Sequence, residues 1–132
     1  MGISSCTVNW LSPEHNWLEV LDENDRPIAV LPEKTVHKQK LRHKRVVVLV
    51  FSPDGRLLLT KRPAQCFDGP GCWDVSLSAH VIAGESGYDI LRQGLYAFLE
   101  MVVSKLRFVL RLDASPQTLN EVLNIFTVRA RT

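Results

Sequence analysis

Cysteine is scarce in this chain. The sequence holds only Cys6, Cys66 and Cys72, an odd number in which no pair has C-x-x-C spacing. Small secreted domains that depend on disulfides carry more thiols in even number, and zinc knuckles need closely spaced pairs. The pattern therefore argues against a disulfide framework and against a zinc knuckle, and it favours a reducing compartment.

Long hydrophobic runs are missing as well. A membrane-spanning helix needs about 18 consecutive apolar residues, and no stretch of the sequence approaches that length. The N-terminal segment also lacks the apolar centre of a secretion signal. We therefore expect a cytoplasmic protein without a membrane partner.

A large net charge is the third absence. The formal charge of +2 is too small to predict a nucleic-acid partner. The charge is unevenly distributed, because residues 34–45 contain six Lys and Arg residues and no acid. Such a run is either a phosphate-facing patch or a solvated loop, and an RNA contact with steep salt dependence is a weaker third interpretation.

What the chain does contain is enough apolar sequence for a core. Its 132 residues are 45% hydrophobic and 23% charged, which is ordinary for a single globular domain. We expect an N-terminal arm over residues 1–15 and one domain over residues 16–132. Within that domain, residues 17–21 and 28–31 have the pattern of a β-hairpin around a polar turn, and Pro32 suits the start of a short helix.

The middle of the chain predicts a buried strand. Residues 46–51 read VVVLVF, an unbroken apolar run that is typical of a strand buried on both faces. The Pro-Asp-Gly turn that follows predicts residues 56–60 as its hairpin partner. Residues 63–71 are rich in Pro and Gly and are expected to form a loop, with Trp73 closing that loop over the core.

The second half of the chain predicts one long helix between strands. Residues 89–102 repeat apolar side chains at the helical period, and residues 106–112 and 121–128 have strand composition. Gly84-Glu85-Ser86 forms a turn before the helix, whose N-terminus offers free N–H groups to an anion. Several strands around one long helix predict a mixed, layered α/β fold.

Several short motifs occur in a specific order along the chain. They are Asp22-Glu23-Asn24-Asp25, Pro53-Asp54-Gly55-Arg56-Leu57-Leu58-Leu59, Lys61-Arg62-Pro63, Pro70-Gly71-Cys72-Trp73-Asp74-Val75-Ser76, Ala79-His80-Val81 and Gly84-Glu85-Ser86. In order and spacing they resemble the Nudix superfamily and, within it, the branch close to isopentenyl-diphosphate isomerase. The resemblance implies an α/β/α sandwich with a mixed β-sheet, a diphosphate-containing substrate and Mg²⁺ or Mn²⁺ as cofactor.

The signature box of that superfamily is altered here. The box reads G-x5-E-x7-R-E-U-x-E-E-x-G-U, where U is a bulky apolar residue, and Glu85 falls on its first acid. Its other polar and glycine positions fall on Ala79, Gln93, Gly94, Ala97, Phe98 and Glu100. Carboxylates one turn apart on a helix hold Mg²⁺ for hydrolysis, and Ala97 and Phe98 cannot. The resemblance thus leaves Glu85 as the catalytic candidate and predicts weak or absent hydrolysis.

A second set of residues resembles the metal site of the isomerase branch. The resemblance implies His37, His43, His80 and Glu121 as metal ligands, with Leu119 in place of a further acid. Imidazole and carboxylate together suit Mn²⁺, Zn²⁺ or Fe²⁺. The alternative is that these histidines only form hydrogen bonds. Ser78 stands where the isomerase needs a reactive cysteine, which argues against isomerase activity.

The remaining expectations concern the substrate and the C-terminus. The resemblance places a diphosphate contact at Arg62, with Lys61 as a weaker neighbour, although both also suit an exposed strand end. Nudix domains usually extend beyond the position of Thr132, so we expect a C-terminally incomplete sandwich whose exposed apolar face favours a homodimer.

The predicted function follows from these sites. We expect a protein that hydrolyses or binds a nucleoside diphosphate derivative or an isoprenoid diphosphate with a divalent metal. The alternatives are a catalytically inactive binding module of the same fold and an isomerase-like activity.

Overall fold

A computed structural model describes residues 16–61, 64 and 71–131. The arm expected over residues 1–15 lies outside the described residues, so the division of the chain into arm and domain stays a prediction. The described part forms a central four-stranded sheet, two smaller two-stranded sheets and helices beside them. None of its helices is long and apolar enough to cross a membrane.

The central sheet is mixed and has the strand order β6-β3-β8-β7. Strand β3 (His43–Phe51) pairs antiparallel with β6 (Leu77–His80) and parallel with β8 (Glu121–Arg129). Strand β7 (Arg107–Leu112) pairs antiparallel with β8 at the edge. The apolar run in β3 lies in the interior of the sheet, where Val46, Val48 and Val50 are buried. The predicted α/β class with a mixed sheet is confirmed.

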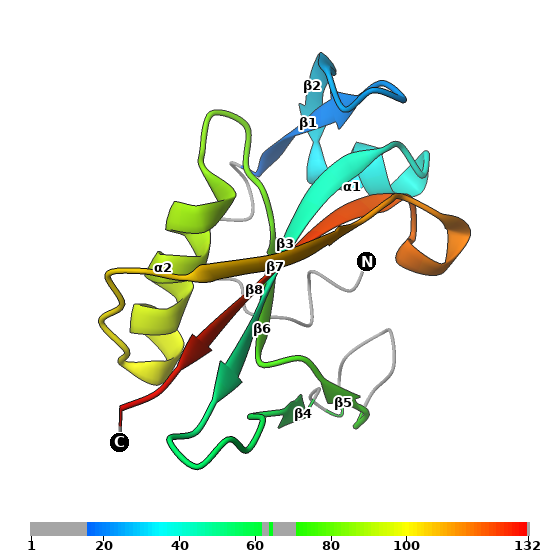
Figure 1. The fold of residues 1–132 in the computed structure, drawn as a ribbon. Coiled ribbons are helices and arrows are strands. Elements are labelled where there is room, and N and C mark those ends of the chain that lie inside the picture. Colours follow the sequence, from blue (N-terminus) through cyan, green and yellow to red (C-terminus); the bar gives the residue numbers. More distant parts are fainter. Residues whose placement is uncertain (1–15, 62–63, 65–70, 132) are drawn as a thin grey trace.

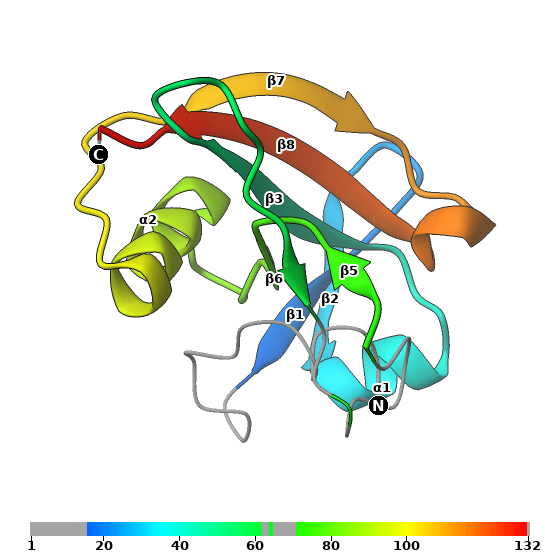
Figure 2. The same ribbon diagram turned by 90° about the horizontal axis from the view of Figure 1, so that it is seen from below.

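Helix α2 (Gly87–Leu99) covers one face of this sheet (Figures 1 and 2). Its fully buried side chains Leu91 and Leu95 belong to the same core as the valines of β3. The helix begins close to the strand, because a Cβ atom added to Gly87 would lie 2.5 Å from Cγ1 of Val46. A larger residue at position 87 would therefore push the helix away from the sheet.

The predicted hairpin and short helix near the N-terminal end of the described chain are confirmed. Strands β1 (Trp17–Leu21) and β2 (Pro27–Pro32) are antiparallel and lead into α1 (Glu33–Lys38). Leu18, Val20 and Val36 form a second small core. These elements lie at one end of the molecule, and the pair β4 (Thr60–Lys61) and β5 (Trp73–Asp74) lies at the other (Figure 1).

The end of the long helix was predicted wrongly. Helix α2 stops at Leu99 because Glu100 adopts a left-handed conformation with φ 53°. The N–H groups of Glu100 and Met101 donate to the carbonyls of Tyr96 and Leu95, respectively, and the first of these bonds is that of an αL helix ending. Val102, expected on the apolar face of the helix, is 85% exposed.

Residues 56–60 do not form the expected continuous hairpin partner of β3. The turn brings Leu57 opposite Phe51, and the Leu58 N–H donates to Val50 at 2.8 Å. The ladder then stops, because the Ser76 hydroxyl lies between the two segments. It accepts from the Val50 N–H at 2.9 Å and donates to the Leu58 carbonyl at 2.6 Å.

Two interpretations of surface segments also change. The basic run over residues 34–45 is not a single solvated loop, because it contributes to α1 and β3: Lys34, Lys38 and Lys40 are exposed, whereas Arg45 is 4% exposed. Trp73 is 67% exposed and does not close a loop over the core. Edge strand β7 exposes apolar side chains, including Phe108 and Leu110. The homodimer that such a face favours stays a prediction.

Candidate metal site

Four elements bring together the residues predicted as metal ligands. His37 lies on α1, His43 on β3, His80 on β6 and Glu121 on β8. In the sheet register, His43 is opposite Glu121, and His80 is opposite Arg45. Neighbouring residues in register point to the same face of a sheet, as do residues two apart on one strand. Register therefore gathers His43, His80 and Glu121 although they are distant in sequence, and α1 adds His37.

The ligand atoms of the four residues are mutually close. Each residue offers one nitrogen or carboxylate oxygen, and these atoms all lie within 4.8 Å of one another. The Nε2 atoms of His37 and His80 are 2.9 Å apart, and Nε2 of His43 is 3.1 Å from Oε2 of Glu121. Ligand atoms about 2 Å from one metal ion lie roughly 3 Å from each other, so these separations suit a shared cation.

The hydrogen bonds of the rings also suit a cation. Nδ1 of His43 lies 2.7 Å from the carbonyl of Leu41, which can only accept, so Nδ1 carries a proton. This second contact orients the ring and leaves Nε2 toward Glu121, as is usual for metal-bound histidines. Nδ1 of His80 is buried without a hydrogen-bond partner, although it lies 3.2 Å from Oε2 of Glu121. The histidine and acid donors thus fit a divalent metal.

The surroundings of His37, His80 and Glu121 shift their pKa values toward the forms that can coordinate a metal. Burial lowers the pKa of His80 to about 3, and the charge of Arg45 acts in the same direction. Burial and the neighbouring His43 lower the pKa of His37 to about 4. Burial alone raises the pKa of Glu121, but contacts with His43 and His80 and the charge of Arg45 outweigh it and bring the pKa below its ordinary value. Neutral imidazoles and an ionised carboxylate are the forms that coordinate metals.

Sequence reasoning missed Arg45 as a member of this cluster and did not connect it to Ser78. Arg45 donates to Oε2 of Glu121 at 3.2 Å and to Oγ of Ser78 at 3.0 Å. Its Nη1 atom also lies 3.3 Å from Nε2 of His80. Had the predicted strand over residues 46–51 been extended back to residue 43, where β3 begins, alternation would have placed Arg45 on the same face as His43. Its contact with Ser78 depends on the register between β3 and β6, which the sequence did not provide.

The cluster lies on the face of the sheet opposite α2. Val46, Val48 and Val50 pack against α2, whereas His43 and Arg45 occupy the alternating positions of β3. Glu85, the predicted catalytic acid, is exposed in the turn before α2 and lies outside the cluster. The structure therefore separates the four predicted metal ligands from the altered Nudix-box helix.

Four of the altered box positions lie on α2, with different surroundings. Gln93, Ala97 and Phe98 are exposed, whereas Gly94 is buried. Leu119, which replaces a further acid, is exposed and precedes β8.

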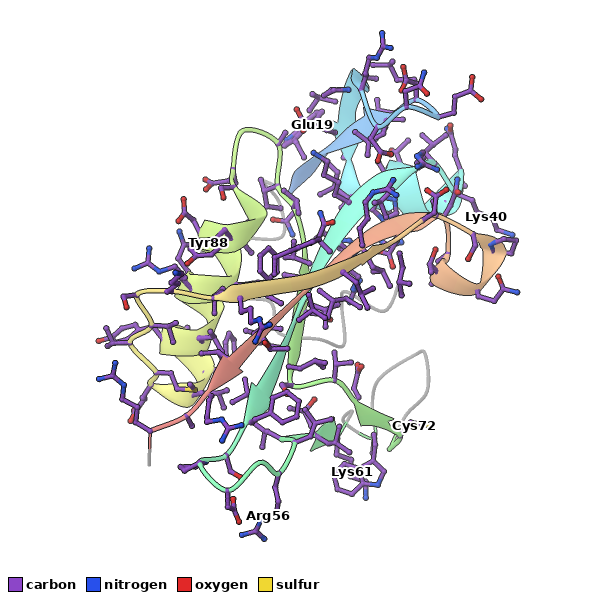
Figure 3. The ribbon with its side chains drawn as sticks, viewed as in Figure 1. Glu19, Lys40, Arg56, Lys61, Cys72 and Tyr88 are labelled. Carbon is purple, nitrogen blue, oxygen red and sulfur yellow. The ribbon has the colours of Figure 1, made fainter. Side chains whose placement is uncertain are left out.

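The predicted diphosphate contacts lie elsewhere or are not described. Lys61 is exposed, and its Nζ atom lies 5.8 Å from the centre of the Trp73 ring. Lys61 and Cys72 lie at the β4–β5 end of the molecule, whereas Lys40 lies near α1 at the opposite end (Figure 3). Arg62 falls outside the described residues.

Comparison with solved structures assigns the fold. The chain superposes on a crystal structure of a Deinococcus radiodurans protein with a TM-score of 0.70, covering 88% of this chain and 73% of that chain at 20% identity. A solution structure of the same protein, described as a hypothetical Nudix protein, matches with a TM-score of 0.55 at 19% identity and covers 93% of this chain and 72% of that chain. The chain has the Nudix fold.

The sequence relatives agree with this fold. An isopentenyl-diphosphate Δ-isomerase of Pectobacterium atrosepticum is 27% identical over 77 residues, or 58% of this chain and 43% of the relative. An uncharacterized Nudix hydrolase of Streptomyces coelicolor is 35% identical over 72 residues, or 54% of this chain and 39% of the relative. No protein-family model matches. The predicted resemblance to the Nudix superfamily and its isomerase branch is confirmed, although the chain spans about two fifths of these relatives.

Proposed function

We propose that this Nudix-fold chain holds a divalent metal ion at His37, His43, His80 and Glu121 and binds a diphosphate-containing compound at that ion. The observation that carries the proposal is the convergence of four ligand atoms within 4.8 Å on one face of the sheet. The bound ion would neutralise phosphate charge. The chain's own residues would hold it, because three imidazole rings and one carboxylate converge from four separate elements.

The donor set favours a particular class of metal. Mg²⁺ prefers oxygen ligands and keeps several waters, whereas imidazole suits Mn²⁺, Zn²⁺, Fe²⁺ or Co²⁺. Three of the four residues here are histidines. Of the two cofactors implied by the resemblance, Mn²⁺ therefore fits these residues better than Mg²⁺. His37 is the only half-buried member, since the other three are buried, so the ion and its ligand approach from the side of α1.

The diphosphate part of the proposal rests on relatives and on charge. The Pectobacterium relative is an isomerase of a diphosphate compound by name. The resemblance proposes Arg62 as the anion contact, whereas Lys61, exposed at the end of β4, lies at the end of the molecule opposite α1 and is the weaker candidate. Guanidinium and ammonium groups are suitable partners for phosphate oxygens.

Hydrolysis by the usual Nudix route is proposed to be weak or absent. Ala97 and Phe98 offer no oxygen ligands, and Glu85 is separated from the histidine cluster. This favours the second candidate function, a binding module that keeps the metal and the ligand but not the reaction. An isomerase-like reaction is less favoured, because Ser78 replaces the reactive thiol and its hydroxyl accepts a hydrogen bond from Arg45.

The test is binding of a nucleoside diphosphate derivative and of isopentenyl diphosphate, each with and without Mn²⁺, by calorimetry. Phosphorus NMR on the same samples follows cleavage. We expect Mn²⁺-dependent binding that His37→Ala lowers at least about tenfold, since one of four ligands is lost. Glu23→Gln, exposed in the β1–β2 turn, is the matched control and should bind as wild type. Binding that is independent of Mn²⁺ and unaffected by His37→Ala contradicts the proposal.

A further inference from the structure

A positive charge already lies inside the proposed metal site. The Arg45 guanidinium is buried, with the residue 4% exposed, and it contacts Glu121 and lies beside His80. We propose that Arg45 is an internal cation that competes with the divalent metal for Glu121 and His80 and thereby sets a weak metal affinity. This inference rests on the proposed metal site and adds the residue that controls it.

The competition arises because the same atoms are involved. Oε2 of Glu121 lies 3.2 Å from Nη1 of Arg45 and 3.1 Å from Nε2 of His43. The Nε2 atom of His80 lies 3.3 Å from the same guanidinium nitrogen. A metal held by Glu121 and His80 would take lone pairs that now face N–H groups of Arg45. Metal binding therefore requires the guanidinium to give up these contacts.

Arg45 cannot leave the site easily. Its Nη2 group donates to the Ser78 hydroxyl at 3.0 Å, and Ser78 is itself buried on β6. Position 45 lies within β3, whose backbone is paired on both sides. A guanidinium does not lose its proton in proteins. The charge consequently stays near an incoming ion, and like charges at such short range repel strongly where water is largely excluded.

The same charge stabilises the protein before metal binds. Within the cluster, Glu121 is the anionic partner of the Arg45 guanidinium, at 3.2 Å. Buried charges need a partner. Replacing Arg45 with a neutral residue leaves Glu121 with excess negative charge, which a divalent cation can satisfy. Loss of Arg45 should therefore lower the stability of the metal-free protein and, in the same variant, raise the affinity for the metal.

The test uses Co²⁺ as the probe, because its visible absorption reports coordination by nitrogen and oxygen. Dissociation constants are measured for wild type, Arg45→Met and Arg45→Lys, together with melting temperatures with and without Co²⁺. Lys44→Met is the matched control, since it removes the same charge from the adjacent position of β3, which faces the other side of the sheet. Arg45→Gln keeps an amide for Ser78 and Glu121 and covers the case in which Arg45→Met does not fold.

We expect the neutral variants to bind Co²⁺ at least about tenfold more tightly than wild type, from removal of nearby charge repulsion. The Co²⁺ dissociation constants of Arg45→Lys and Lys44→Met should stay within about threefold of the wild-type value. Arg45→Lys keeps a positive charge in the site, and Lys44→Met removes a charge that lies outside it. Without Co²⁺, the neutral variants should have lower melting temperatures than wild type. Addition of Co²⁺ should raise their melting temperatures by more than it raises that of wild type. Equal or weaker Co²⁺ binding by the neutral variants overturns the inference.

A further variant separates the inference from the metal site itself. Adding His80→Ala to the tight-binding neutral variant should abolish the gain in Co²⁺ affinity. If wild type loses Co²⁺ binding with His80→Ala but the neutral variants bind no more tightly, the metal site stands and the competition by Arg45 is wrong. If no variant binds Co²⁺, the proposed metal site fails, and the inference fails with it.

Discussion

At the scale of single residues, Glu121 carries the interactions on which the site depends. Its Oε2 atom contacts His43 and Arg45 and lies 3.2 Å from Nδ1 of His80. The side chain is buried, so each of these groups relies on it rather than on water. A carboxylate in this position is the counter-charge of a buried guanidinium and, in the proposed site, would also be a metal donor.

Glu121→Gln should therefore lower the free energy of unfolding by about 3 kcal/mol, because it leaves the Arg45 charge buried without an anionic partner. Urea unfolding monitored by circular dichroism measures the change. Glu23→Gln, at an exposed position, makes the same chemical replacement and should change stability by less than about 0.5 kcal/mol. Equal effects of the two variants would show that Glu121 is not paired as described.

Residue identity predicted the candidate ligands but not their neighbours. His37, His43, His80 and Glu121 were found by matching positions to a family, and the structure brings them together. The role of Arg45 was missed because the basic run was interpreted as one unit. In a strand, successive side chains point to opposite faces of the sheet, so adjacent cations such as Lys44 and Arg45 have different surroundings.

At the scale of elements, α2 has the buried apolar face expected of the Nudix-box helix but lacks the box carboxylates, which Gly94, Ala97 and Phe98 replace. Ile90, Leu91 and Leu95 are fully buried. Their spacing is the helical period that the sequence predicted for the buried face. The predicted end of the helix was wrong because the apolar pattern continues through Val102, and a glutamate at position 100 gives no stop signal. The superfamily box has glycine at this position, and the structure gives Glu100 a positive φ of 53°.

Glu100→Gly should raise the free energy of unfolding by about 1 kcal/mol, because glycine adopts the left-handed conformation without the steric cost of a side chain. Thermal and urea unfolding measure the effect. Tyr96→Gly provides a control of opposite sign, since it lies within the same helix and should lower stability by about 1 kcal/mol or more. Destabilisation by Glu100→Gly would mean that the helix does not end at Leu99.

Strand partners were harder to predict than the strands themselves. The turn after β3 was recognised from Pro-Asp-Gly, but the return segment pairs with β3 only briefly. The Ser76 hydroxyl that bonds to both segments comes from a distant part of the chain. Local sequence carries turn chemistry, whereas such long-range hydrogen bonds follow only from the complete fold.

At the scale of the whole molecule, ion pairs join the β1–β2 hairpin to the central sheet. Asp25, in the hairpin turn, accepts from Arg42 at 2.7 Å and also pairs with Arg111 of β7. Arg42 in turn pairs with Asp113 at 2.7 Å. Partial burial raises the pKa of Asp25, but hydrogen bonds from Arg42 and Arg111 outweigh it and hold that pKa below its ordinary value.

Asp25→Asn should lower stability by about 1 kcal/mol at neutral pH, a value typical of a networked surface pair. A carboxyl with a lowered folded pKa stabilises the fold above its unfolded pKa, and this contribution is lost as pH falls through the folded pKa. The stability difference between wild type and Asp25→Asn should therefore shrink as pH falls below about 4. A difference that is constant from pH 7 to pH 3 in urea unfolding would contradict this account.

The central claim is that one Nudix-fold chain gathers a metal site on the face of its sheet away from α2. The most direct measurement is metal content and Mn²⁺ affinity of the wild type beside the double variant His37→Ala, Glu121→Gln, after both are stripped with chelator and reloaded. We predict that wild type takes up Mn²⁺ and that the double variant, lacking two of the four ligands, does not. Equal Mn²⁺ uptake by the two proteins, or none by wild type, would contradict the account.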